Sequence, residues 1–328
     1  MHISASWPRL GGLALLALLG CSNAGEDFGF NPSGSGTVLG FVYLDRDGTL
    51  DITQGDTVFA GVRVGLVVSG TTDTVKTALV DATGNVRFTG VPFGNYQFVV
   101  DSTTVGDSLE IQAIDTAAVH LRANGASQTV VSRLGFPLTT IAAARGLPIG
   151  SRIFVVGTAL APLDVFGDTT AHIQGGGVAI RLANARDGGF PSSAGDSVRV
   201  LGTVTLRAGQ PVLDTAIVYA FNNGPAAVPV ALTTLQANTA DGGAQDAALV
   251  QITNANIDST SVAVPGQDFH AFVSDGTGTL EIVLDGDLTL PVGQFQVGKK
   301  VTGRGLLVPT GTGTWVFKPR LASDVTVS

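Results

Sequence analysis

The chain has 328 residues and a formal net charge of -8, with 26 acidic residues against 18 lysines and arginines. This balance argues against a protein whose whole surface binds nucleic acid. Only 13% of the residues are charged and 44% are hydrophobic, so the chain can bury sizeable cores and is not intrinsically disordered. Its length suggests about two or three domains. The 44 glycines and the lack of long 3.6-residue periodicity predict an all-β chain of short strands and tight turns.

Residues 1–20 carry Arg9 in a polar start, followed by an apolar run that ends in Leu18-Leu19-Gly20-Cys21. The run is too short for a transmembrane helix, which needs about 20 apolar residues. It resembles a bacterial lipoprotein signal peptide, and this resemblance implies cleavage before Cys21 and lipid attachment to its thiol. The alternative is an ordinary secretory leader with a chance Gly-Cys pair. Cys21 is the only cysteine, so no intramolecular disulfide competes for it.

The resemblance implies an extracytoplasmic protein that a lipid at Cys21 anchors to the membrane. Ser22 follows the cysteine, where an Asp commonly signals inner-membrane retention, so the outer membrane is favoured if the host is diderm. Residues 21–35 have loop composition and predict a flexible tether. The partner beyond the membrane is expected to be a protein or a polysaccharide, which the sequence does not identify.

Residues 36–137 are predicted to form a first β-sandwich. Its turns contain Gly84 and Gly94, and Phe88, Tyr96 and Phe98 are expected in the core. The segments 45–51, 61–64, 84–88 and 91–96 resemble the prealbumin-like, Ig-like sandwich of collagen-adhesin B-type repeats and carboxypeptidase regulatory-like domains. Strands are expected at 37–43, 61–68, 74–80, 85–89 and 95–100, with 108–114, 117–121 and 128–134 at the edge of the same domain.

Residues 138–228 and 229–328 share one layout, which indicates an internal duplication. Thr140 is expected to cap a short helix, and each copy then has a glycine patch, at 175–177 and 275–278, between predicted strands. The alignment pairs Ile180 with Ile282 and Val212 with Val316. The layout resembles two tandem bacterial OB-fold-like β-barrels.

Closely spaced carboxylates in one loop of the first domain suggest a metal site. Asp45, Asp47, Asp51 and Asp56 supply the oxygen ligands that calcium prefers. Compared with calcium-binding relatives of the B-type repeats, the loop is about two residues short, and Arg46 adds an opposing charge. The alternative is a hairpin loop whose aspartates cap turns. No other cofactor is indicated.

The histidines that follow the predicted leader do not fit a catalytic arrangement. His120, His172 and His270 stand alone in the sequence, without a nucleophile motif or a metal-binding His-x-x-x-His spacing. His172 and His270 are expected to be partly exposed strand residues. The sequence therefore predicts that the protein is not an enzyme.

A late basic cluster gives the alternative function. Lys299, Lys300, Arg304, Lys318 and Arg320 are interleaved with Trp315 and Phe317, a pattern that binds single-stranded nucleic acid on OB barrels. The net charge disfavours this partner, and the alternation of Trp315 with Phe317 favours a buried final strand with a satisfied indole N–H. The main hypothesis is an anchored, non-enzymatic binding or scaffold module. The alternative is an accessory subunit that binds single-stranded nucleic acid through the second barrel.

Overall fold

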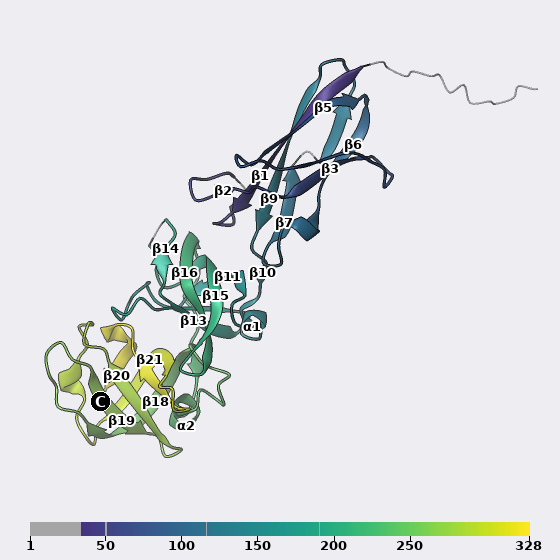
Figure 1. Ribbon diagram of the computed structural model, residues 1–328. Helices are drawn as coiled ribbons and strands as arrows, with labels where there is room; N and C mark the ends of the chain where they lie inside the picture. The colour runs from purple at the N-terminus through teal and green to yellow at the C-terminus, as the bar shows by residue number, and fades with distance from the viewer. Residues whose placement is uncertain (1–33, 50, 116, 190) are drawn as a thin grey trace, which may run out of the picture.

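The computed structural model describes residues 34–49, 51–115, 117–189 and 191–328, and this part of the chain is almost entirely β. It forms three units arranged end to end (Figure 1). The predicted leader, Cys21 and nearly all of the predicted tether lie outside the described residues. Within the described ranges, no helix has the length and apolar character needed to cross a membrane.

The first unit is a sandwich of two sheets. One sheet has the order β2-β1-β9-β7, with β5 also paired to β1, and the other has the order β4-β3-β6-β8. The strands are β1 (Ser35–Asp45), β2 (Thr57–Val58), β3 (Arg63–Val68), β4 (Thr74–Leu79), β5 (Asn85–Pro92), β6 (Gly94–Val100), β7 (Glu110–Asp115), β8 (Ala118–Leu121) and β9 (Ser127–Gly135).

Alternating apolar residues fill the sandwich core. Val38 and Val42 on β1 are fully buried, and side chains two apart on a strand share one face. Phe88 and Phe98 meet edge to face at 6.4 Å between ring centres, as the predicted core requires. The hydroxyl of Tyr96, also buried, donates to the carbonyl of Pro92 at 2.9 Å.

The expected edge position of the segment 128–134 is wrong. Strand β9 lies between β1 and β7 in the interior of its sheet. It runs parallel to β1, with Val38 opposite Gln128 and Leu44 opposite Leu134. This central position follows from burial, because Val130 and Leu134 are fully buried in the core that Val38 also enters.

The second and third units are closed five-stranded barrels with the same topology. The rings run β11-β12-β13-β16-β15 and β18-β19-β20-β22-β21, and in each the last strand pairs back with the first. In the first barrel β13 and β16 are parallel, and in the second barrel β20 and β22 are parallel; the other pairs in each ring are antiparallel. This confirms the all-β fold with two OB-like barrels.

The barrel strands are longer than the sequence patterns suggested. They comprise β11 (Arg152–Ala159), β12 (Ala171–Gly175), β13 (Val178–Ala183), β15 (Asp196–Arg207), β16 (Gln210–Asn223), β18 (Leu249–Thr260), β19 (Phe269–Ser274), β20 (Thr279–Leu284), β21 (Lys300–Pro309) and β22 (Trp315–Lys318). Short strands border them: β10 (Leu138–Thr139), β14 (Arg186–Asp187), β17 (Val230–Ala231) and β23 (Val325–Val327).

The parallel pairs correct the repeat alignment. Leu182 lies opposite Leu213 in the first barrel, and Ile282 lies opposite Phe317 in the second. Ile282 therefore corresponds to Leu182 and not to Ile180 when the final strands are matched. The error is two residues, which keeps the same face of the strand towards the core.

A threonine-capped helix precedes each barrel. In α1 (Ile141–Ala144), Thr140 Oγ1 accepts from the backbone N–H of Ala143, which confirms the predicted cap. In α2 (Thr234–Asn238), Thr233 and Gln236 form a reciprocal capping box. These bonds satisfy backbone N–H groups that a short helix leaves without partners.

The first barrel has its own hydrophobic core, and part of this barrel also packs into the core of the second barrel. Leu160, Ala161 and Phe166 of the first barrel are buried within the cluster that fills the second. Polar contacts cross the same boundary: Arg145 Nη1 donates to Asp246 Oδ2 at 3.2 Å, and Arg320 donates to the carbonyl of Leu160. The barrels therefore pack as one body.

Trp315 provides a test of this packing. The side chain is only 6% exposed, and its indole Nε1 donates to Asp246 Oδ1 at 2.8 Å, which confirms the predicted burial and satisfied N–H. We expect Trp315→Ala to destabilise the protein by about 3–5 kcal/mol, because it empties a core site. Trp315→Phe keeps most of the ring volume and should lower stability by about 1–3 kcal/mol through the lost hydrogen bond.

Chemical denaturation of both variants measures these differences. In the chain that begins at Cys21, Trp315 is the remaining tryptophan, so its fluorescence reports this site alone. A blue-shifted emission maximum is expected. A red maximum that single-stranded DNA quenches would contradict the buried position and support the nucleic-acid hypothesis.

Candidate functional site

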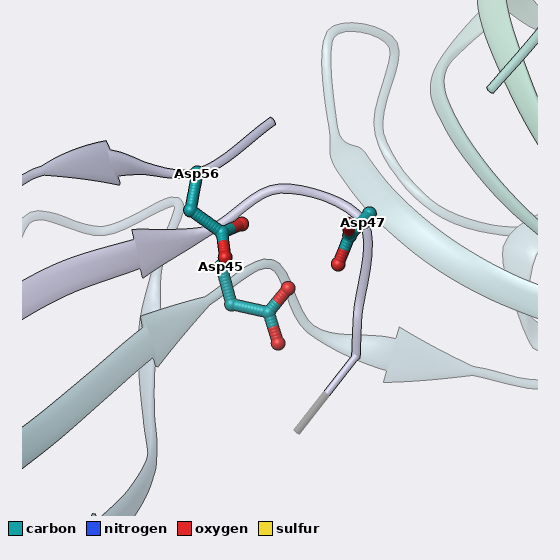
Figure 2. Close-up of side chains that lie close together, drawn as sticks. All are labelled: Asp45, Asp47 and Asp56. Carbon is teal, nitrogen blue, oxygen red and sulfur yellow. The ribbon is translucent and has the colours of Figure 1, made fainter. Parts of the chain in front are cut away.

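Three of the four predicted calcium ligands come together in the structure. One carboxylate oxygen from each of Asp45, Asp47 and Asp56 lies within 4.8 Å of the others. Their carboxylates turn towards a shared space beside the end of β1 (Figure 2). Asp51 is exposed and is not part of this group, although its backbone carbonyl accepts from Thr49 Oγ1 at 3.0 Å.

The loop between β1 and β2 positions these side chains through local hydrogen bonds. Asp56 accepts from the backbone N–H groups of Arg46 and Thr53, both at 2.9 Å. Asp47 accepts from Thr49 N at 2.9 Å and from Thr53 Oγ1 at 2.7 Å. Turn capping is therefore present in the loop, and it orients the carboxylates that a cation would need.

Turn capping explains only one of the two carboxylate oxygens of Asp45. Its side chain is only 1% exposed, and its Oδ1 accepts from Gly48 N at 2.5 Å. The other oxygen, Oδ2, is buried without a hydrogen-bond partner, and its ion pair with Arg133 is long, at 3.8 Å from Nε. Burial, with the negative charges of Asp56 and Asp47, raises the pKa of Asp45 to about 6.

A hard divalent cation fits this arrangement only in part. Calcium takes six to eight oxygen ligands. The buried Oδ2 of Asp45, which has no hydrogen-bond partner, could serve as one of these ligands. Asp45, Asp47 and Asp56 supply three of these ligands, so backbone carbonyls or water must supply the others. The geometry is compatible with a weak calcium site.

The histidines are dispersed and have different environments. His172 is 1% exposed, so the expectation that it is partly exposed is wrong. It lies against Phe166 in the interior, where burial lowers its pKa to about 3 and keeps the ring neutral. His120 Nδ1 contacts Asn95 Oδ1 at 2.7 Å, and His270 Nδ1 contacts Glu281 Oε1 at 2.6 Å.

His270 and Glu281 do not form a nucleophilic site with a third group. Ser261 Oγ is the nearest hydroxyl in the hydrogen-bond network, but it accepts from the backbone N–H of His270. Among the described side chains, no hydroxyl bonds to the imidazole ring of His270.

The late basic cluster is largely neutralised within its own barrel. Lys318 pairs with Asp285 at 2.5 Å, and Arg320 pairs with Asp324 at 2.9 Å. Arg304 also reaches Asp324, at 3.7 Å. Trp315 and Phe317 are buried core residues, and Lys299 and Lys300 are exposed at the start of β21. Trp315 and Phe317 are therefore not available to stack nucleic-acid bases.

Sequence reasoning missed a second group of basic residues, at the junction of the sandwich and the first barrel. Arg46, Arg152, Arg186 and Arg199 come from four separate segments; the charges of Arg46 and Arg186 act on Arg152, and Arg199 lines a cavity at the same junction. No local pattern in the sequence marks them. A correct prediction of strand pairing could have found Arg199, because Arg199 lies opposite Tyr219 on the neighbouring strand and both line a cavity with Asp47 of the acidic loop.

Comparisons with known proteins give distant likenesses. No family model and no curated protein matches the chain. Among solved structures, the minor pilin GBS52 of Streptococcus agalactiae is similar with a TM-score of 0.22 and 16% identity, over 30% of this chain and 44% of the pilin. The Bacillus anthracis TIE protein has a TM-score of 0.25 and 12% identity, over 58% of this chain and 32% of that protein.

A murine DNA-binding protein, solved with double-stranded DNA, has a TM-score of 0.27 and 10% identity, over 53% of this chain and 94% of that chain. The chain spans less than half the length of the pilin and about a third of the TIE protein. At these scores the likenesses carry no argument about function.

Calcium is expected to stabilise the protein weakly. Extracellular calcium modules bind at about 10⁻⁴–10⁻³ M, so about 2 mM calcium should stabilise by about 1 kcal/mol. Thermal unfolding with calcium and with a chelator measures the difference. Asp56→Asn should remove it, and Asp51→Asn, outside the group, should retain it. A stabilisation of several kcal/mol, or the same response in both variants, would contradict a weak site at these residues.

The raised pKa of Asp45 predicts a pH effect in the presence of a chelator. Because the folded state holds the proton more tightly, stability is fully present below about pH 4 and falls as the pH rises through about 6. A shift of this size corresponds to at most about 3 kcal/mol. Asp45→Asn should remove that fall and raise stability at pH 7.5, as measured by urea unfolding. An unchanged pH profile in Asp45→Asn would show that other groups cause it.

Proposed function

We propose that this protein is an extracytoplasmic, lipid-anchored scaffold that presents a non-enzymatic binding surface away from the membrane. The observation that carries this proposal is the packing at both junctions between its three units. Flexible linkers would leave the units free to reorient, whereas packed interfaces hold a fixed spacing. The end-to-end arrangement in Figure 1 suits a spacer.

The junction of the sandwich and the first barrel has its own small core. Phe136 and Phe154 meet edge to face at 6.2 Å, and they pack with Leu201 and Ile217. Leu44 and Leu109 of the sandwich pack against this cluster. Tyr219 also donates its hydroxyl to the carbonyl of Arg46 at 3.2 Å, across the junction.

The junction between the barrels is stronger, because it combines an apolar cluster built from both barrels with buried polar contacts. Phe166 of the first barrel lies under the ammonium of Lys318, 4.4 Å from the ring centre, while Asp285 pairs with the same ammonium. The two contacts of Lys318 therefore come from different barrels: Phe166 lies in the first barrel and Asp285 in the second. Separation of the barrels would expose this pair and the apolar cluster together.

Membrane attachment is the part of the proposal that a single substitution tests. Cys21→Ala removes the thiol that would carry the lipid, so the variant should move from the membrane fraction to the soluble fraction. Ser22→Ala keeps the thiol and should remain with the membrane. Fractionation and N-terminal sequencing measure both properties. Equal membrane binding of Cys21→Ala and the native chain, or a processed N-terminus other than residue 21, would refute the anchor.

A further inference from the structure

A cavity of about 420 Å³ lies where the sandwich meets the first barrel. Asp47, Gly48 and Thr49 line it from the sandwich loop, and Arg199 and Tyr219 line it from β15 and β16. Phe221, also in the lining, is 56% exposed, although it is a large apolar side chain. The cavity therefore combines aromatic surface, a cation and an acid.

Arg199 is the central cation of this cavity. Its Nε is buried without a hydrogen-bond partner, and the side chain lines a second cavity of about 370 Å³ on its other side. Within the described residues, Arg199 forms no ion pair with an acid. Gly48 is packed so closely on the guanidinium that a side chain there would collide with it. A buried, charged donor without a partner needs an acceptor.

The positive charge extends beyond Arg199. Burial lowers the pKa of Arg152, and the charges of Arg46 and Arg186 lower it further, so these three arginines lie within electrostatic range of one another. Burial and the charge of Asp47 raise the pKa of Tyr219, which faces the cavity, and the charges of Arg186 and Arg46 oppose this rise. None of the three arginines forms an ion pair within the part of the chain that the structure describes. In a chain of net charge -8, these arginines form a basic region beside Asp47 that can attract an anion carrying hydrogen-bond donors.

We propose that the cavity between Asp47, Arg199 and Tyr219 binds a carboxylate-bearing sugar, a uronic acid residue of a polysaccharide. The planar guanidinium of Arg199 matches a carboxylate in two parallel hydrogen bonds. Tyr219 and Phe221 provide aromatic surface for the apolar face of a sugar ring. Glycines 188 and 189 leave the rim without side chains, so a ring can approach the backbone.

Asp47 favours a ligand that carries hydroxyl groups beside its negative charge. Its carboxylate accepts hydrogen bonds, and the hydroxyl groups of a sugar can donate them. A phosphodiester backbone has no donor for Asp47 and would only be repelled by it. The cavity also differs from the continuous basic groove that tracks a single strand. This inference rests on the proposed binding module and names its ligand class.

The test is a calorimetric titration of the chain that begins at Cys21, with a chelator present. The probes are tetragalacturonate and its fully methyl-esterified form, which has the same rings without the charge. The acid should bind at least about tenfold more tightly than the ester, because a charge-assisted hydrogen bond contributes about 1.5–3 kcal/mol. Arg199→Gln and Phe221→Ala should each weaken binding of the acid about tenfold or more, and Arg87→Gln, an exposed arginine on β5, should not.

Thermal unfolding of each variant establishes that it is folded, and Arg46→Gln serves as an exposed substitution if Arg199→Gln does not fold. Equal binding of acid and ester, full binding by folded Arg199→Gln or Arg46→Gln, or binding that requires calcium would overturn the proposal. Equally effective competition by oligo(dT) would assign the cavity to nucleic acid instead. Failure to bind either sugar would also overturn it, while the fractionation of Cys21→Ala would still decide the anchor.

Discussion

The buried carboxylate of Asp246 is the contact on which the arrangement of the barrels depends. It is 1% exposed and accepts from the indole of Trp315 and from the guanidinium of Arg145. A buried charge is tolerated only when it is paired and hydrogen-bonded. Because Arg145 caps α1 at the first barrel and Trp315 begins the last barrel strand of the second barrel, satisfying this one charge fixes one barrel against the other.

The two junctions solve the same packing problem with different chemistry. Between the barrels, Arg145 pairs with Asp246 and donates to the carbonyl of Ala179, and Lys318 pairs with Asp285. Between the sandwich and the first barrel, a small apolar core holds the units while arginines beside it lack acidic partners. The first arrangement stabilises an assembly, whereas the second leaves donors available for a ligand. The proposed ligand site therefore lies at the junction of the sandwich and the first barrel, whereas the junction between the two barrels holds them in a fixed arrangement.

Local patterns in the sequence predicted the local features of the fold. Alternation placed Phe88 and Phe98 in the sandwich, and the duplicated layout identified both barrels. Long-range strand pairing could not be predicted in this way. The position of β9 in its sheet depends on its pairing with β1, whose residues lie about 90 positions earlier in the sequence. The acidic partners of the late basic cluster could not be predicted for the same reason, since Lys318 pairs with Asp285, which is 33 residues away. The junction arginines escaped notice because four distant segments contribute them.

Asp47 connects the acidic loop to the neighbouring cavity. It belongs to the carboxylate group at the end of β1, and it also lines the cavity that Arg199 enters. A cation held by the three carboxylates would neutralise part of the negative charge that faces Arg199, and so strengthen the local field for an anion. By linkage, an anion in the cavity would then favour the cation by the same factor. The short distance between these groups follows from the turn at Gly48, where φ is +73° and a side chain would strike Arg199. One glycine thus sets how closely the acidic loop and the arginine approach.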